Sequence, residues 1–325
     1  MLELTRMHVE ERMSYRVIAK RIKERYAIRI SKNTACRLVN QVALYSKGDI
    51  RIKEEYHPHW QGYLTVDDKY YSVCGEKKMI LTATDSSGEL LHIEMLEQIE
   101  QHRADEFFGF IKDRLDYQFK GISTDMDEML EKSIEKRGGK DVPHQKCLKY
   151  AMDAIDRIFE LKQKRRKLQC TVLSQEKEYR MALLRYREAE KIYNSSKQVL
   201  YGKEPVAYLY KELKRIEKKY PGLKSFFNRH LDKLLTYKTV PEINKTNNIA
   251  ENMNRQLMRR LKTIESFKSP DCAKNYLNLY KNYLRFKPYT DCRGNNKIKN
   301  GKSPIEVCGV KLKTKDWLKN AVSFY

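Results

Sequence analysis

Three strand-like runs that follow one another closely constrain the fold of this chain most. QGYLTVDDKYYSVCG begins at Gln61, KKMILTATDSSG at Lys77 and GELLHIEMLE at Gly88, and all three are rich in β-branched, aromatic or aliphatic residues. The turn from Asp85 to Gly88 has the composition of a hairpin turn. Runs joined this closely predict antiparallel neighbours in one sheet.

A helix, a strand and another helix follow these runs. RADEFFGFIKDRLDYQF carries apolar residues at helical spacing, GISTDM is a short strand, and DEMLEKSIEKRGG is a helix that ends in glycines. The short run PHQKC supplies one more strand. We therefore expect an α/β (α+β) fold, a mixed five-stranded sheet flanked by helices on both faces.

The first 46 residues predict a trihelical unit of the helix-turn-helix kind. Ser14 and Ser31 can each cap a helix. Apolar residues line the inner side of the first capped helix (Val17, Ile18, Ile22, Tyr26) and of the second (Ala35, Leu38, Val42). The outward residues of the second are the expected DNA contacts: Lys32, Asn33, Thr34, Arg37 and Gln41. The alternative is a small helical packing domain with a solvated basic face.

The rest of the chain divides by composition. Residues 1–46 form the expected DNA-binding domain, and residues 47–59 are a polar linker. Residues 60–147 form the first part of the core. Residues 148–240 read as a helical insertion, because much of this stretch lacks Gly and Pro and is dense in Lys, Arg and Glu. Its basic surface is either a solvated helix face or a track for DNA. Residues 241–325 complete the core and form a C-terminal tail.

The charge balance points to a polyanionic partner. The chain has 66 Lys and Arg against 43 Asp and Glu, a formal charge of +23, which favours nucleic acid. No apolar stretch approaches the roughly 20 residues of a membrane span, so we expect a soluble, cytoplasmic protein. The seven cysteines are scattered, and His144 with Cys147 is either a pair of metal ligands or part of a short buried strand.

Three acids are the candidate catalytic residues: Asp67, Asp125 and Glu251. Asp67 lies within a strand, where a buried carboxylate needs a divalent cation or a Lys or Arg partner, and Asp68 is its rival. Asp125 ends a strand and could instead cap a helix, with Asp127 as a competing cap. Glu251 could complete a capping box with Asn248.

The helix that contains Glu251 has two assignable faces. One is an apolar stripe of Met253, Leu257, Leu261 and Ile264. The other carries Glu251 together with the remaining expected DNA contacts: Asn254, Arg255 and Lys262. A carboxylate and cations on one exposed stripe suit a metal site beside a phosphate backbone.

Four segments together carry a family resemblance: VDDKYYSV, ISTDM, TNNIAENMNRQL and SPIEVCGV. The set resembles the DDE transposases of prokaryotic insertion sequences, which have an RNase H-like catalytic core. The resemblance implies that Asp67, Asp125 and Glu251 hold two Mg²⁺ or Mn²⁺ ions, which support cleavage of transposon ends and strand transfer into target DNA. It also implies a homodimer or larger assembly on double-stranded DNA.

The chain departs from the family pattern after the second acid. Many relatives carry a Cys followed closely by a His there, whereas Cys147 is followed by Leu148. The alternative function is a non-catalytic, sequence-specific DNA-binding protein or a domesticated regulator on the same scaffold.

Overall fold

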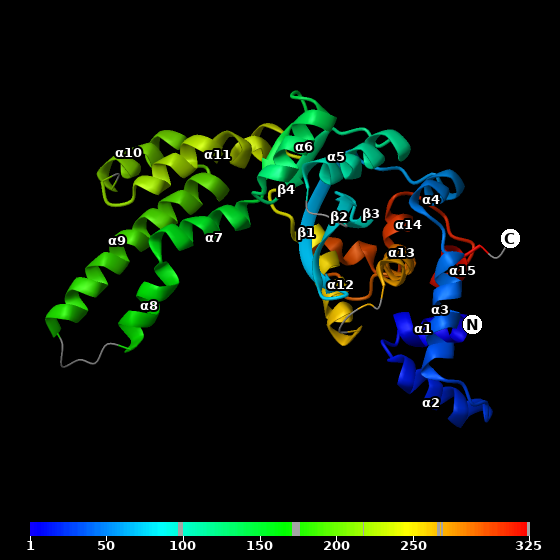
Figure 1. Ribbon diagram of the computed structural model, residues 1–325. Helices are drawn as coiled ribbons and strands as arrows, with labels where there is room; N and C mark the ends of the chain where they lie inside the picture. The colour runs from blue at the N-terminus through cyan, green and yellow to red at the C-terminus, as the bar shows by residue number, and fades with distance from the viewer. Residues whose placement is uncertain (97–99, 171–175, 217, 265–266, 268, 324–325) are drawn as a thin grey trace. The chain divides into compact units, whose positions relative to one another are not determined.

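The computed structural model describes residues 1–96, 100–170, 176–216, 218–264, 267 and 269–323. The chain forms two compact units. The first comprises Met1–Ile122, Glu128–Val142 and Asn247–Tyr325, and the second comprises Ser123–Asp127 and Pro143–Thr246. The helices of the expected helix-turn-helix therefore belong to the same unit as the strand-rich part of the core (Figure 1).

One mixed sheet contains the five expected strands, in the order β3-β2-β1-β4-β5. β1 and β2 are antiparallel, as are β2 and β3, and the register places Asp67 opposite Thr82. The expected fold class is confirmed. The strands are β1 (Tyr63–Val73), β2 (Glu76–Asp85), β3 (Leu90–Leu96), β4 (Gly121–Thr124) and β5 (His144–Lys146).

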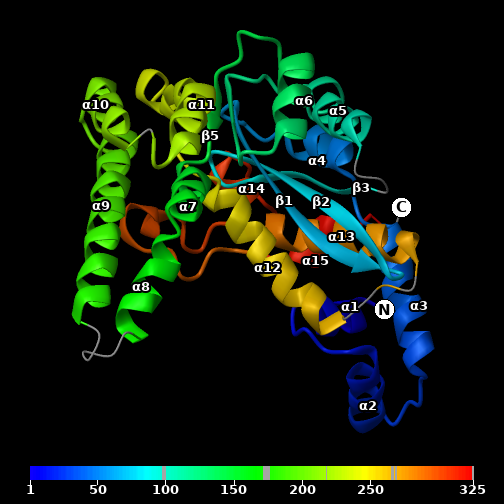
Figure 2. The ribbon, with the colours of Figure 1, turned by 60° about the vertical axis from the view of Figure 1, so that its left-hand side comes forward.

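Within the first unit, helices cover both faces of the three antiparallel strands (Figure 2). α5 (Gln101–Gly109), which continues into the π-helix η1 (Phe110–Arg114), and α6 (Glu128–Gly138) share a core with Leu64, Val66 and Leu81. α12 (Asn248–Ile264) and α13 (Pro270–Phe286) share the other core with Val73 and Ile80. Because strand side chains alternate, odd-numbered β1 residues face α12 and even-numbered ones face α5 and α6.

Three helices form the N-terminal part: α1 (Leu2–Val9), α2 (Tyr15–Tyr26) and α3 (Lys32–Leu44). The caps expected from the sequence are confirmed, since Ser14 Oγ accepts from Val17 N–H and Ser31 Oγ accepts from Thr34 N–H. The inner stripe of α2 is narrower than expected, because Val17 and Tyr26 are exposed while its two isoleucines are buried.

The expected linker at 47–59 is wrong in part, because it contains helix α4 (Asp49–Tyr56). Asp49 is buried and forms ion pairs with two side chains of α13, Lys281 (2.6 Å) and Arg285 (3.0 Å). Burial alone would raise the pKa of Asp49, but these two cations outweigh it and hold that pKa well below its usual range. Arg285 also pairs with the buried Glu89 at 2.6 Å. This buried ionic cluster fixes α4 against the core.

Short elements and the second unit complete the architecture. The first unit ends with the 3₁₀-helix η2 and two short helices, α14 and α15, and in the second unit α8 and α9 pack side by side, as do α9 and α10 (Figure 1). The ranges are η2 (Gly294–Lys299), α14 (Pro304–Val307), α15 (Trp317–Ala321), α7 (Leu148–Phe159), α8 (Leu161–Cys170), α9 (Glu176–Tyr201), α10 (Val206–Ile216) and α11 (Pro221–Thr239).

Candidate functional site on β1 and α12

Asp67 is fully buried in the middle of β1. Its Oδ2 accepts a hydrogen bond from Asn254 Nδ2 at 2.7 Å and lies 3.3 Å from Lys69 Nζ. Burial raises the pKa of Asp67 even though Lys69 opposes the shift. The Asp67 carboxylate therefore has a lysine partner, which is one of the two alternatives expected from the sequence, the other being a divalent cation. Because its pKa is still raised, additional positive charge nearby would stabilise its ionised form.

A hydrogen-bonded chain of side chains crosses from β2 to β1 through α12. Thr82 Oγ1 donates to Asn254 Oδ1 at 2.6 Å, and Asn254 Nδ2 in turn donates to Asp67 Oδ2. The Asp67 carboxylate only accepts hydrogen bonds, so the Asn254 amide turns its NH₂ group towards it and its oxygen towards the Thr82 hydroxyl, which donates. The chain thereby sets the orientation of the Asp67 carboxylate.

This finding corrects the role expected for Asn254. The sequence placed Asn254 on an exposed, DNA-facing stripe, but it is fully buried and both of its amide atoms are engaged. Arg255 and Lys262 are exposed, as DNA contacts require. α12 packs closely enough on β1 and β2 to bury a polar position on the side of the helix that also holds Glu251.

Glu251 lies in the first turn of α12 and is 8% exposed. The residue before this helix ties it to β1, since Asn247 Nδ2 donates to the carbonyl of Val66 at 3.0 Å, directly beside Asp67 in the chain. Asn248 is the first residue of α12 and not the residue before it, which does not match the register of the capping box. The structure thus brings Glu251 and Asp67 onto neighbouring elements of one unit.

The position of α12 also separates Asp67 from its rival Asp68. Asp67 is an odd-numbered residue of β1 and faces α12, whereas Asp68 is half-buried on the side of α5 and α6. Only Asp67 therefore shares a face of the sheet with Glu251.

Asp125 belongs to the second unit. It is half-buried, and its Oδ1 accepts a hydrogen bond from the backbone N–H of Asp127 at 3.0 Å. This is a local turn of the kind that Asp side chains favour. α6 begins at Glu128, so Asp125 does not lie directly before that helix.

The sequence left two alternatives for His144 and Cys147, a pair of metal ligands or part of a short buried strand, and the structure has a short buried strand here. His144 lies in β5, where its Nε2 is 2.8 Å from Thr124 Oγ1, and Cys147 precedes α7. In the part of the chain that the structure describes, no group of three or more His, Cys, Asp or Glu side chains has the arrangement of a metal site. The carboxylates of Asp67 and Glu251 nonetheless supply the oxygen ligands that Mg²⁺ and Mn²⁺ prefer, and the raised pKa of Asp67 suits a cation.

The expected DNA-reading face of α3 is accessible. Lys32, Asn33, Arg37 and Gln41 are exposed, and Thr34 is half-buried with its hydroxyl 3.0 Å from that of Ser31. Four of the five expected side chains are thus accessible to a DNA groove, whereas the hydroxyl of the fifth, Thr34, lies beside the Ser31 cap.

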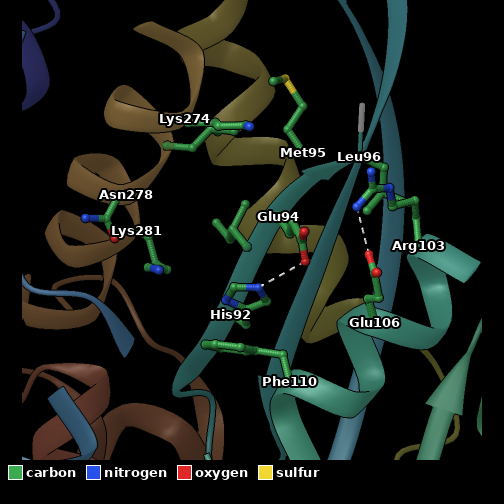
Figure 3. Close-up of a pocket in the computed structure, with 12 residues that line it drawn as sticks. His92, Glu94, Met95, Leu96, Arg103, Glu106, Phe110, Lys274, Asn278 and Lys281 are labelled. Atoms are coloured by element: carbon green, nitrogen blue, oxygen red, sulfur yellow. Dashed lines mark hydrogen bonds and ion pairs between the residues drawn. The ribbon is translucent and has the colours of Figure 1, made fainter. Parts of the chain in front are cut away.

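A cavity of about 680 Å³ lies elsewhere in the first unit, along β3 between α5 and α13 (Figure 3). Cations and acids alternate on its walls, where His92 pairs with Glu94 at 3.4 Å and Arg103 with Glu106 at 2.8 Å. Neither Asp67 nor Glu251 lines it. Its charges are largely paired within the protein, so we do not include it in the candidate site.

Neither Thr82 nor Asn247 stands out in the sequence as a site residue. Both are ordinary strand or turn residues in the sequence, and their partners are distant in the chain, since Thr82 bonds to Asn254 on α12 and Asn247 bonds to Val66 on β1. For Thr82, the signal that could have suggested its role is the register of β1 and β2, which puts it opposite Asp67.

Comparisons with known proteins add no assignment. None of the helices in the described ranges is long and apolar enough to cross a membrane. No protein-family model and no curated protein matches the chain.

Proposed function

We propose that this chain is a DDE-type transposase, which cleaves DNA at transposon ends and transfers the strands into a target with the help of divalent cations. The observation that carries the proposal is Asp67, a fully buried carboxylate whose pKa is raised, held in orientation by the helix that bears Glu251. A cation site would explain why a carboxylate with a raised pKa is buried at this position. The net charge of +23 favours a polyanion as the substrate.

The residues have separate tasks in this proposal. Asp67, Asp125 and Glu251 would hold two Mg²⁺ or Mn²⁺ ions, which when bound activate water or a 3′-hydroxyl and stabilise the leaving oxygen. Asn254 orients the Asp67 carboxylate through its amide, and Thr82 orients Asn254. Burial raises the pKa of Asp67, and Lys69 opposes this rise and so favours the ionised form.

DNA binding is assigned to exposed residues in two places. The outward residues of α3 would read a major groove, and Arg255 and Lys262 would contact phosphates beside the acids. Joining two transposon ends implies at least two copies of the chain on DNA, so we propose a homodimer or larger assembly.

The test is metal-dependent cleavage of a duplex that carries the ends of the DNA segment encoding the chain. We expect the wild-type chain to cut it with Mg²⁺ or Mn²⁺, and D67N, D125N and E251Q to bind it without cutting. D68N is the matched control, because it removes a neighbouring charge from the opposite face of β1, and it should still cut. Full cleavage by any one of the three variants would remove that residue from the site.

A non-catalytic DNA-binding protein is the second candidate, and Lys69 favours it. Its ammonium already lies 3.3 Å from the Asp67 carboxylate, so a cation from the chain itself could serve where a metal ion would. Under this hypothesis the wild-type chain binds the same duplex with sequence preference but never cuts it, at any concentration of Mg²⁺ or Mn²⁺.

A further inference from the structure

A second cavity of about 520 Å³ lies in the first unit, where the N-terminal helices meet α12 and α13. This volume is in the range of pockets that hold drug-sized ligands and cofactors. None of the acids proposed for catalysis lines it. The cavity is therefore separate from the candidate catalytic site and needs its own explanation.

The mouth of this cavity is positively charged. Arg16 and Lys32 are exposed on its rim, and Arg260 lies buried in its wall, where it donates to the carbonyl of His8 at 2.7 Å. Among the lining residues that the structure describes, none is acidic. Burial, reinforced by Arg260, lowers the pKa of His8 to about 4, so this imidazole is neutral near pH 7. The surroundings favour an anionic group at the mouth.

The interior of the cavity is aromatic and apolar. Tyr15, Phe267 and Tyr276 line it, and Tyr15 stacks on His8 with ring centroids 4.2 Å apart. Phe267 and Tyr276 contact each other at 5.5 Å. Such walls accept a flat aromatic group, because aromatic rings bind one another in stacked or edge-on arrangements.

One polar group in the cavity wall is incompletely satisfied. Tyr276 is 4% exposed, and within the described residues its hydroxyl makes no hydrogen bond of normal geometry, although the nearby Arg260 guanidinium partly offsets the rise in its pKa that burial causes. A buried hydroxyl without a partner is unfavourable unless a ligand satisfies it. It lies on the aromatic side of the cavity, where the polar edge of a bound ring system would be.

We propose that this cavity binds a nucleotide, with the base among the aromatic residues and the phosphate beside Arg16 and Lys32. The cationic mouth, the aromatic interior and the hydroxyl of Tyr276 match the three parts of such a ligand. The nucleotide is either free in solution or an unpaired nucleotide of the DNA on which α2 and α3 sit. This inference does not depend on the proposed cleavage chemistry, because it invokes no metal ion and none of the three acids.

The experiment uses the fluorescence of 2-aminopurine with the full chain. One arm titrates free 2-aminopurine deoxynucleoside monophosphate, and the other titrates a duplex with a single extrahelical 2-aminopurine, with the fully paired duplex and inorganic phosphate as references. Saturable binding in the first arm identifies a free nucleotide. A fluorescence change specific to the extrahelical base, without binding of the free nucleotide, identifies DNA as the source.

Matched variants locate the binding. Cys272→Phe places a ring in the cavity and should abolish the signal, whereas Cys272→Ser leaves the space open and should retain it. Arg16→Gln should weaken binding about tenfold by removing a charged contact, while Arg21→Gln, the same change on the same helix outside the cavity, should not. Tyr276→Phe should weaken binding while leaving the melting temperature of the free protein unchanged or higher.

Two results would overturn the inference. One is the absence of a signal with both probes in the wild-type chain. The other is equal binding by wild type and Cys272→Phe, or equal losses from Arg16→Gln and Arg21→Gln. If Cys272→Phe fails to fold by circular dichroism, the arginine pair and Tyr276→Phe still decide the question.

Discussion

Replacing Thr82 with valine tests whether the side-chain chain from β2 to Asp67 matters. The substitution keeps the shape of the side chain but removes the hydroxyl that donates to Asn254 Oδ1 at 2.6 Å. Thr82 and Asn254 are both fully buried, so water cannot readily replace the lost donor. An unsatisfied buried acceptor costs about 1–3 kcal/mol, and we expect the free energy of unfolding to fall by about that amount.

The same substitution should also weaken cation binding. Without the Thr82 hydroxyl the Asn254 amide loses one of its two anchors, so its NH₂ group holds the Asp67 carboxylate less firmly. Losing such an orienting contact behind a metal ligand typically lowers metal affinity about 10- to 100-fold. The measurements are urea unfolding followed by circular dichroism, and Mn²⁺ binding followed by electron paramagnetic resonance.

Thr82→Ser is the control, because it keeps the hydroxyl and loses only a methyl group. We expect it to bind Mn²⁺ like the wild-type chain, even if it is slightly less stable. The reasoning fails if Thr82→Val binds Mn²⁺ normally, or if the serine variant loses as much Mn²⁺ affinity as the valine variant. A stability loss without an affinity loss would mean that the chain of side chains supports packing only.

Three further predictions concern other parts of the first unit. Arg285→Met removes the cation that pairs with the buried Glu89 and one of the two cations of α13 beside Asp49, and it should destabilise the protein by about 3–5 kcal/mol in urea unfolding. Arg51→Met, at an exposed ion pair, should change stability by less than about 0.5 kcal/mol. Burial lowers the pKa of His8 to about 4 in the folded protein, so between about pH 6.5 and pH 4 this imidazole is protonated in the unfolded chain but not in the folded one. At about pH 5 this difference lowers the free energy of unfolding by about 2 kcal/mol. Urea midpoints measured at pH 7 and pH 5 should show this loss in the wild-type chain and not in His8→Gln. Arg37→Ala should weaken binding to a preferred duplex by about 1–3 kcal/mol and relax its sequence preference in competition assays, while Lys262→Ala should weaken all duplexes alike and reduce the salt dependence.

Local patterns predicted the elements of this fold well. Alternating and helical spacings are set by neighbouring residues, so the runs from Gln61 to Leu96 indicated the antiparallel strands, and Ser14 and Ser31 indicated two helix starts. These features need no knowledge of distant contacts.

Features that depend on distant partners were missed. The segment 47–59 is polar and reads as a linker, yet α4 forms there because Asp49 meets Lys281 and Arg285 from α13. Asn254 reads as a surface residue for a similar reason, since its partners lie on β1 and β2. A polar residue is buried where hydrogen-bond or ion-pair partners satisfy it, and a local sequence pattern does not identify partners that are distant in the chain.

The division of the first unit into three separate stretches of chain also affects how the protein is made. The face of the sheet that carries Val73 and Ile80 is covered by α12 and α13, which end at Phe286. At typical synthesis rates the ribosome needs about 10–40 s to extend the chain from β3 to that point. During this interval the ribosome makes the stretch Pro143–Thr246, and α12 and α13 do not yet cover the apolar face. Protection of that face by a chaperone would therefore raise the yield of folded protein in the cell.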